Sequence, residues 1–500
     1  MQATLAAALL GLALSPSRAT GSPLDRRDDA LADCLAAAGV PTDIPGTDDW
    51  AQDAAPFNLR LSYTPAAIAV PATADHVRDA VACGRALGVK TSAKCGGHSY
   101  ASFGLGGEDG HLVVELDRLN AVVLDAASGV ADVQAGARLG HVAAELYDQG
   151  KRGISHGTCP GVGVAGHALH GGFGMSSHTK GLALDWMVGA TVVLANSTVV
   201  DVSETEHPDL FWAIRGAGSS VGIVTSFRFK TFEAPETVTL FVASVPWKNQ
   251  SVAADGLKAV QDFALNSMPA ELNMRVFVTG HFVNLEGLYW GDNENMQAVL
   301  QPLLDKTGAK LQLQQQGGWM DQLKHFGNGM PLDQGHPYDS HETFYSSSLY
   351  TRELSDKQVE ALTTYWFSYA KSNKRDWYFQ LDIHGGNTSA VTAPGVDSTS
   401  YAHRDYLFMY SFYDPVDGGS YPADGFSCMQ NFVSNITAGM GQFGQYINYP
   451  DSVMTQETAQ ARYWGAHLPR LQAIKAEVDP DDLFHYPQGI TPAKSTILDD

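Results

Sequence analysis

Two glycine-rich loops, each carrying a nucleophilic side chain, constrain this chain of 500 residues more than any other feature. The first loop, 95–99, presents His98, and the second, 157–181, presents Cys159. Glycine lets the backbone approach a flat ligand closely, and successive N–H groups in such loops form nests that bind anions such as pyrophosphate. A neutral imidazole and a thiolate can both add to an electrophilic ring near neutral pH. The loops therefore indicate a cofactor site, with a loop histidine and a disulfide cysteine as the ordinary alternatives.

Short strands and helices alternate around these loops up to residue 235. A helix over 75–87 has Thr73 as its N-cap and Gly88 directly after its end, and both residue types are favoured at those positions. Apolar alternation and turn residues predict the other elements of this part. They are strands at 68–70, 89–93, 112–116, 130–134, 186–194, 198–202 and 222–232, and helices at 139–147 and 208–214.

After Pro235 the strands become longer and alternate with amphipathic helices. Strands are expected at 238–245, 272–278, 285–290, 377–383 and 406–413, and helices at 253–265, 356–371 and near 457–478. The pattern predicts an α+β fold whose second domain is an antiparallel sheet covered by helices. We expect a first domain over 28–235, a second over 236–449, and a C-terminal segment, 450–500, that returns to the first.

Two familiar motifs in the sequence do not identify the functional site. Gly161-x-Gly163-x-x-Gly166 matches the dinucleotide fingerprint. That motif requires an apolar strand directly before it, and no such strand is predicted here. A metal site could be formed by His167, His170 and His178, yet neither HExxH nor Cys-x-x-Cys accompanies these histidines. We expect no metal, and interpret these histidines as polar residues near a cofactor or in ordinary loops.

The N-terminus and the net charge indicate an exported protein with a neutral small substrate. An apolar stretch, 5–14, is too short to span a membrane, and 17–19 resembles a cleavage site, so residues 1–27 are expected to be a signal peptide with a propeptide. The net charge of −22 disfavours nucleic acid and anionic membranes as partners. Asn-x-Ser/Thr sequons, expected as glycosylation sites, stand at Asn196, Asn249, Asn387 and Asn435.

The chain has five cysteines, so at least one thiol is left without a cysteine partner. Cys34 and Cys83 both lie in predicted helices and are expected to form a disulfide. Cys95 and Cys159 lie in the glycine-rich loops, and at least one of them is expected to take part in the chemistry of the site. No role is predicted for Cys428.

The two loops resemble those of the berberine-bridge-enzyme-like flavoprotein oxidases of the vanillyl-alcohol-oxidase superfamily. The resemblance rests on residues 94–100 and 157–172 and extends through 181–185, 209–218, 222–224, 446–449 and 486–488. These segments together span almost the whole mature chain. It implies a two-part FAD-binding domain in which His98 bonds to the flavin 8α-methyl group and Cys159 to flavin C6. Cys95 stands where a small residue, often glycine, is expected, and should not compete with Cys159. Other residues implied in FAD binding are Gly96, Gly97, Ser99, Gly163, Gly166, Gly222, Ile223, Tyr486 and Gln488.

Within that family the chain is most similar to fungal gluco-, xylo- and chitooligosaccharide oxidases. Tyr378, Gln380 and Asp382 alternate on one face of a predicted strand. The resemblance implies a stacking aromatic, a sugar-binding amide and a carboxylate beside the catalytic base, which is Tyr449. It also implies sugar contacts by Tyr100, Ser411 and Glu271. An exposed, half-polar sheet surface is the ordinary alternative.

The implied reaction oxidises the reducing-end C1 hydroxyl of a β-1,4-linked oligosaccharide to a lactone, with O₂ reduced to H₂O₂. Three alternatives stay open: a non-sugar alcohol or alkaloid as substrate, another electron acceptor in place of O₂, and a non-catalytic carbohydrate-binding protein. The choice among glucose, xylose and N-acetylglucosamine units also stays open. We expect a secreted monomer.

Overall fold

The computed structural model describes residues 23–334 and 340–494, so most of the predicted signal peptide lies outside the described residues. The first sheet has the strand order β1-β2-β4-β3, with β2 and β3 both parallel to β4. Helix α3 connects β2 to β3 and is capped as expected: Thr73 accepts a hydrogen bond from the His76 N–H, and Gly88 ends the helix at φ 63°. The bounds are α1 Pro23–Ala37, β1 Thr42–Asp43, α2 Trp50–Asp53, β2 Ala67–Ala69, α3 Ala74–Leu87, β3 Thr91–Lys94 and β4 Leu112–Glu115.

A second, five-stranded antiparallel sheet has the order β5-β6-β10-β8-β9. The predicted hairpin is present as β8 paired with β9. The segment 157–181, expected to be one long loop, contains two short helices, because its glycines separate short helical stretches. The bounds are β5 Val122–Asp125, β6 Val130–Gln134, α4 Leu139–Gly150, β7 Arg152–Gly153, α5 Val164–Ala168, α6 Ser177–Lys180, β8 Met187–Val193, β9 Val199–Val202, α7 Pro208–Ala217, β10 Ile223–Lys230 and β11 Phe232–Glu233.

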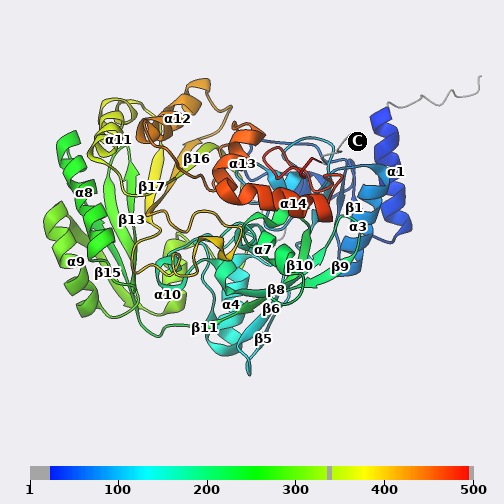
Figure 1. Cartoon of the computed structure of the whole chain (residues 1–500), viewed down its shortest axis with the longest axis horizontal. Coiled ribbons are helices and arrows are strands. Elements are labelled where there is room, and N and C mark those ends of the chain that lie inside the picture. Colours follow the sequence, from blue (N-terminus) through cyan, green and yellow to red (C-terminus); the bar gives the residue numbers. More distant parts are fainter. Residues whose placement is uncertain (1–22, 335–339, 495–500) are drawn as a thin grey trace, which may run out of the picture.

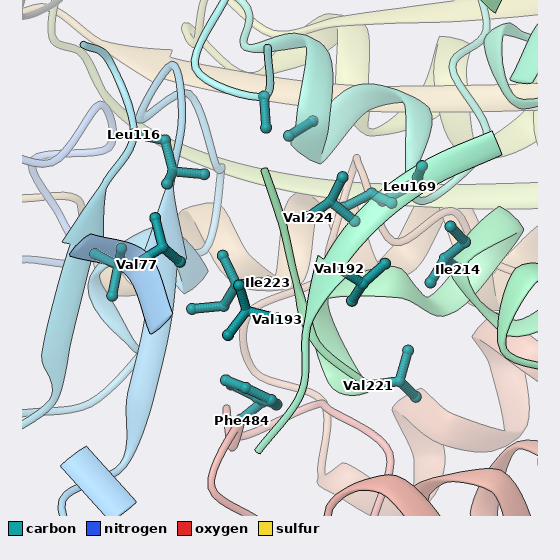
Figure 2. Packing of buried hydrophobic residues seen from close by; sticks show 14 of the residues in the cluster. Val77, Leu116, Leu169, Val192, Val193, Ile214, Val221, Ile223, Val224 and Phe484 are labelled. Atoms are coloured by element: carbon teal, nitrogen blue, oxygen red, sulfur yellow. The ribbon is translucent and has the colours of Figure 1, made fainter. Parts of the chain in front are cut away.

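One hydrophobic core joins both sheets to the C-terminal segment. Figure 2 shows Val77 of α3, Val193 of β8 and Ile223 of β10 close to Phe484 from the end of the chain. All four side chains are almost fully buried. This arrangement confirms the two-part first domain, and the C-terminal segment contributes to its core.

The remaining strands form a seven-stranded antiparallel sheet in the order β15-β12-β14-β13-β17-β18-β16. Helices α8, α9, α11 and α12 cover one face (Figure 1) and share a second core with it, which confirms the α+β fold. Strands β15 and β16 were not predicted, because glutamines and serines dominate them. The bounds are β12 Val238–Ser244, α8 Gln250–Asn266, β13 Leu272–Thr279, β14 Val283–Tyr289, α9 Asn293–Thr307, β15 Lys310–Gly317, α10 Trp319–Phe326, β16 Thr343–Thr351, α11 Asp356–Ser368, β17 Tyr378–Ile383, β18 Phe408–Val416 and α12 Ala423–Thr437.

Two helices, α13 (Gln456–Trp464) and α14 (Leu468–Val478), replace the single helix expected near 457–478. Gly465, at φ 47°, ends α13, and a short 3₁₀ turn leads into α14. At the C-terminal end of α14 a buried ion pair between Lys475 and Asp479, 2.6 Å apart, fixes the chain end. Asp479 also accepts the backbone N–H groups of residues 483 and 484. Among the described residues, no helix has the length and hydrophobicity that crossing a membrane requires.

Candidate active site

A cavity of about 580 Å³ is lined by both glycine-rich loops and by the uncovered face of the seven-stranded sheet. Most of the residues predicted for the site line it. They are Gly96, Gly97, His98, Ser99, Tyr100, Cys159, Gly163, Gly166, Gly222, Ile223, Tyr378, Gln380, Ser411, Tyr449 and Tyr486. Residues from widely separated parts of the sequence therefore meet at one cavity.

The two glycine-rich loops pack directly against each other. A Cβ atom added at Gly163 would lie 2.3 Å from the backbone nitrogen of Gly96 and 2.3 Å from Cys95 Sγ. The buried Arg138 holds both loops, because its Nη1 donates to the carbonyl oxygens of Gly96 (2.9 Å) and Gly161 (3.0 Å). Gly163 of the apparent dinucleotide fingerprint thus serves loop packing, and the fingerprint leads only into the short helix α5.

This packing brings the two nucleophiles together: Cys159 Sγ lies 3.5 Å from His98 Nε2. The Phe57 ring stacks on the imidazole at a centroid distance of 3.8 Å. Burial lowers the pKa of His98 to about 4, so the imidazole is neutral and keeps a free electron pair at neutral pH. Burial raises the pKa of Cys95 to about 11, so its thiol stays protonated and does not compete with Cys159.

Two histidines of the second loop, His167 and His170, also line the cavity, whereas His178 does not. Burial lowers the pKa of His167 to about 3 and that of His170 to about 4, so both are neutral. His170 Nδ1 contacts the Gly166 carbonyl (2.9 Å), whereas its buried Nε2 has no hydrogen-bond partner among the described residues. No cluster of described residues could hold a metal ion.

The donor set fits a flavin dinucleotide. Flavin C6 and the 8α-methyl group lie on the same edge of the isoalloxazine ring, so two nucleophiles that attack them must be neighbours, as His98 and Cys159 are. Gly166 has open space where a side chain would stand, which leaves room for a cofactor beside the loop. The unpartnered His170 nitrogen offers a further polar contact.

The sheet face at the cavity carries its polar and aromatic side chains in rows across neighbouring strands. The innermost row is set by the register Glu286–Arg275–Asp382 on β14, β13 and β17. Two residues further along each strand lies a mixed row, Asn284–Phe277–Gln380–Ser411. The outer row places Tyr378 beside Tyr413, with ring centroids 5.1 Å apart.

Tyr449 and Asp382 interact at the inner end of this face. Burial, and next the negative charge of Asp382, raise the pKa of Tyr449 above its ordinary value, so the phenol is protonated at neutral pH. Burial raises the pKa of Asp382 to about 7, while the Arg275 cation opposes this shift. Arg275 is itself paired with Glu286, Nε to Oε1 2.6 Å. A carboxyl group that titrates near neutrality beside a tyrosine can take up and release that tyrosine's proton.

Two further tyrosines differ in what surrounds them. The Tyr100 ring lies against the Tyr449 ring, with centroids 5.8 Å apart and an interplanar angle of 22°. The Tyr446 hydroxyl instead accepts hydrogen bonds from the Gly172 N–H (2.9 Å) and Asn448 Nδ2 (3.0 Å). Tyr446 therefore fixes the second loop and does not line the cavity, whereas Tyr449 does.

Three of the predicted site residues do not line the cavity: Asp382, Glu271 and Gln488. Asp382 is buried, only 3% exposed, and acts on Tyr449 through its charge. Glu271 is exposed just before β13, because it precedes the stretch in which alternate residues face the cavity. Gln488 is buried, and its amide is committed to Tyr463, Asp451 and Met454. Arg275 and Glu286 were not predicted from the sequence. An alternation on β13 could have indicated Arg275, since Arg275, Phe277 and Thr279 alternate there as Tyr378, Gln380 and Asp382 do on β17.

Two protein-family models match the chain. The FAD binding domain model matches residues 65–203, and the model described as berberine and berberine like matches residues 445–491. Both matched segments contribute residues to the cavity. The second contains Tyr449, and the first contains His98 and Cys159.

Full-length relatives agree with these matches. A xylooligosaccharide oxidase from Thermothelomyces thermophilus is 50% identical over 95% of this chain and 97% of its own length. The structure of a xylooligosaccharide oxidase from Myceliophthora thermophila C1 in complex with xylobiose superposes with a TM-score of 0.91 at 49% identity, covering 93% of this chain and 100% of that chain.

A third relative bears on the cofactor. The glucooligosaccharide oxidase from Acremonium strictum, with a 6-S-cysteinyl, 8α-N1-histidyl FAD, superposes with a TM-score of 0.90 at 45% identity, covering 93% of this chain and 99% of that chain. The extent of identity in these relatives far exceeds what a shared fold alone requires. The chain belongs to the berberine-bridge-enzyme-like family of FAD-binding oxidoreductases.

Proposed function

We propose that this protein is a secreted oxidase that converts the reducing-end C1 hydroxyl of β-1,4-linked oligosaccharides to the lactone, with FAD bonded to His98 and Cys159. The observation that carries the proposal is the position of Tyr449 at one cavity with that nucleophile pair and with the polar and aromatic sheet face. Relatives that oxidise xylo-, gluco- and chitooligosaccharides support the substrate class.

Bound FAD supplies a hydride acceptor at the site and a route for the electrons to O₂, which yields H₂O₂. Tyr449 removes the proton of the C1 hydroxyl. Because the pKa of Tyr449 is raised, the phenol must give up its own proton as it does so. Asp382, with its pKa raised to about 7, takes that proton.

The sheet face binds the sugar chain in this proposal. Gln380 and Ser411 offer hydrogen bonds to ring hydroxyls from one row, and Tyr378 and Tyr100 offer aromatic faces on either side. The small Ser411 side chain, only 4% exposed, leaves room for units with or without a hydroxymethyl group. We therefore propose that both xylo- and cello-oligosaccharides are substrates.

The proposed secretion rests on the N-terminal apolar stretch and on the disulfide between Cys34 and Cys83, which is formed in the structure. The sequon residues Asn196, Asn249 and Asn387 are exposed, and Asn435 is partly exposed, as glycosylation requires. The propeptide is proposed to end at the dibasic pair Arg26-Arg27, which lies within α1. We retain the proposed domains 28–235, 236–449 and 450–500 and a monomeric state.

The proposal is tested by measuring O₂ consumption and H₂O₂ production with glucose, cellobiose, cellotriose, xylose, xylobiose and xylotriose. Oligosaccharides should have the higher kcat/KM, because sugar units bound on the sheet help to position the reacting carbon. Equal efficiency for monomer and trimer would contradict the oligosaccharide assignment. Turnover with a dye but without H₂O₂ would replace the oxidase by a dehydrogenase.

A further inference from the structure

A continuous series of aromatic rings leads from the inner cavity to its rim on the sheet side. Tyr378 lies 5.3 Å from Phe277 between ring centroids, and Phe277 stacks on Phe282 at 6.0 Å with an interplanar angle of 29°. All three side chains line the cavity. Tyr378 also stacks on Tyr413, so the series continues toward Tyr100 in the first domain.

Phe282 is unusual in this series because it is 48% exposed. It belongs to the turn between β13 and β14, and its carbonyl accepts the Thr279 N–H (3.0 Å), which holds the turn in place. Other large apolar side chains exposed among the described residues do not line the cavity. Exposure of a phenylalanine ring to water is unfavourable, and a ligand that covers the ring at the cavity rim removes this cost.

Phe282 lies far along the sheet from Asp382, which marks the end of the site where the sugar is oxidised in the proposed reaction. Asp382 and Tyr378 are four residues apart on β17, which corresponds to about 13 Å along a strand. Phe282 is level with the outer row, because Thr279 is paired with Tyr378 in the register and the Thr279 N–H donates to the Phe282 carbonyl. A span of that length takes more than two β-1,4-linked pyranose units, so the ring at Phe282 cannot belong to the oxidised unit.

We propose that Phe282, supported from below by Phe277, is an outer binding subsite for the third sugar unit of the substrate, counted from its oxidised end. This inference rests on the proposed function and adds a site to it. The flat apolar face of a pyranose stacks on an aromatic ring without needing a particular hydroxyl pattern. The subsite therefore selects for chain length and not for the identity of the sugar.

The test compares wild type with Phe282→Ala on xylose to xylotetraose and glucose to cellotetraose. The variant should lower kcat/KM for trimers and tetramers by about two- to tenfold, the value of one aromatic stacking contact. Mono- and disaccharides should be unaffected, and kcat at saturation should stay unchanged. Phe282→Trp should restore the length preference. Equal losses on all lengths, or no loss on trimers, would overturn the subsite.

Tyr369→Ala is the matched control, because Tyr369 is 65% exposed and lies away from the cavity; it should change no kcat/KM. Calorimetric titration of trisaccharide into Tyr449→Phe, with and without Phe282→Ala, measures binding without turnover. Weaker trisaccharide binding in the double variant supports the subsite, and equal binding overturns it. Wild type that oxidises no saccharide would refute the proposed function, and the titration would still decide the subsite.

Discussion

Tyr449 and Asp382 are the residues on which the proposed chemistry depends most. Their roles were predicted from the resemblance, and the negative charge of the buried Asp382 acts on Tyr449. What the sequence could not supply is the environment that sets their protonation. Burial and the Arg275 cation together set the pKa of Asp382 at about 7. Which side chains bury a group is a property of tertiary packing.

Tyr449→Phe should retain folding and flavin and lose about 10²–10⁴-fold in turnover, because only the proton acceptor is removed. The measurement is kcat on cellobiose or xylobiose, with flavin content from absorbance. Tyr446→Phe is the control: it leaves the Gly172 N–H without its acceptor and should cost stability, about 1–3 kcal/mol, more than turnover. Near-normal turnover in Tyr449→Phe would assign the base elsewhere.

The pH dependence of kcat/KM should have an acidic limb near pH 7. Asp382 must be ionised to accept a proton, and its folded-state pKa is about 7, so activity is lost as the pH falls through that value. The Arg275 cation lowers this pKa. Arg275→Met should therefore move the limb to higher pH, whatever its effect on substrate binding. Asp382→Asn should abolish the limb; an unchanged limb in that variant would exclude Asp382 as its origin.

At the scale of elements, periodic patterns predicted helices and strands correctly, whereas close contacts between backbones could not be predicted. The hairpin β8–β9 and helix α3 follow from apolar periodicity and caps, and both are present. The polar strand β16 was missed because its serines form hydrogen bonds to residues about 100 positions away, which no local pattern reveals. The contact between the glycine-rich loops is likewise visible only in three dimensions.

Gly163→Ala tests that loop contact. The added Cβ would meet Cys95 Sγ and the Gly96 backbone, each at 2.3 Å, so the loops must separate and the two nucleophiles must move apart. The fraction of protein carrying bound flavin, measured by absorbance after purification, should fall substantially. Gly441→Ala is the control, since nothing lies within 4 Å of its added Cβ, and full flavin content in Gly163→Ala would contradict this role.

At the scale of the whole molecule, the C-terminal segment ties the two ends of the chain into one core. Its return to the first domain was predicted, and Phe484 and Tyr486 do lie in that core. The buried pair of Lys475 and Asp479 that fixes it was not predicted. Its spacing of four residues occurs on many helix surfaces, and only the fold shows that both side chains are inaccessible to solvent.

Lys475→Met should destabilise the protein by about 3–5 kcal/mol, because it leaves the Asp479 carboxylate buried without its cation. Denaturant unfolding followed by tryptophan fluorescence measures the loss. Lys258→Met is the control, since its pair with Asp356 is exposed and such pairs contribute about 0–1 kcal/mol. Equal stability of the two variants would show that the buried pair does not hold the chain end.

The attachment of flavin through His98 and Cys159 is the central claim, and denaturation tests it most directly. Wild-type protein is precipitated in acid, and flavin absorbance is measured in the pellet and the supernatant. The flavin should stay in the pellet for wild type, His98→Ala and Cys159→Ala, the single variants each keeping one bond, and mass spectrometry should find it on the corresponding peptide. The double variant should release it. Wild-type protein that gives up its FAD to the supernatant would contradict the account.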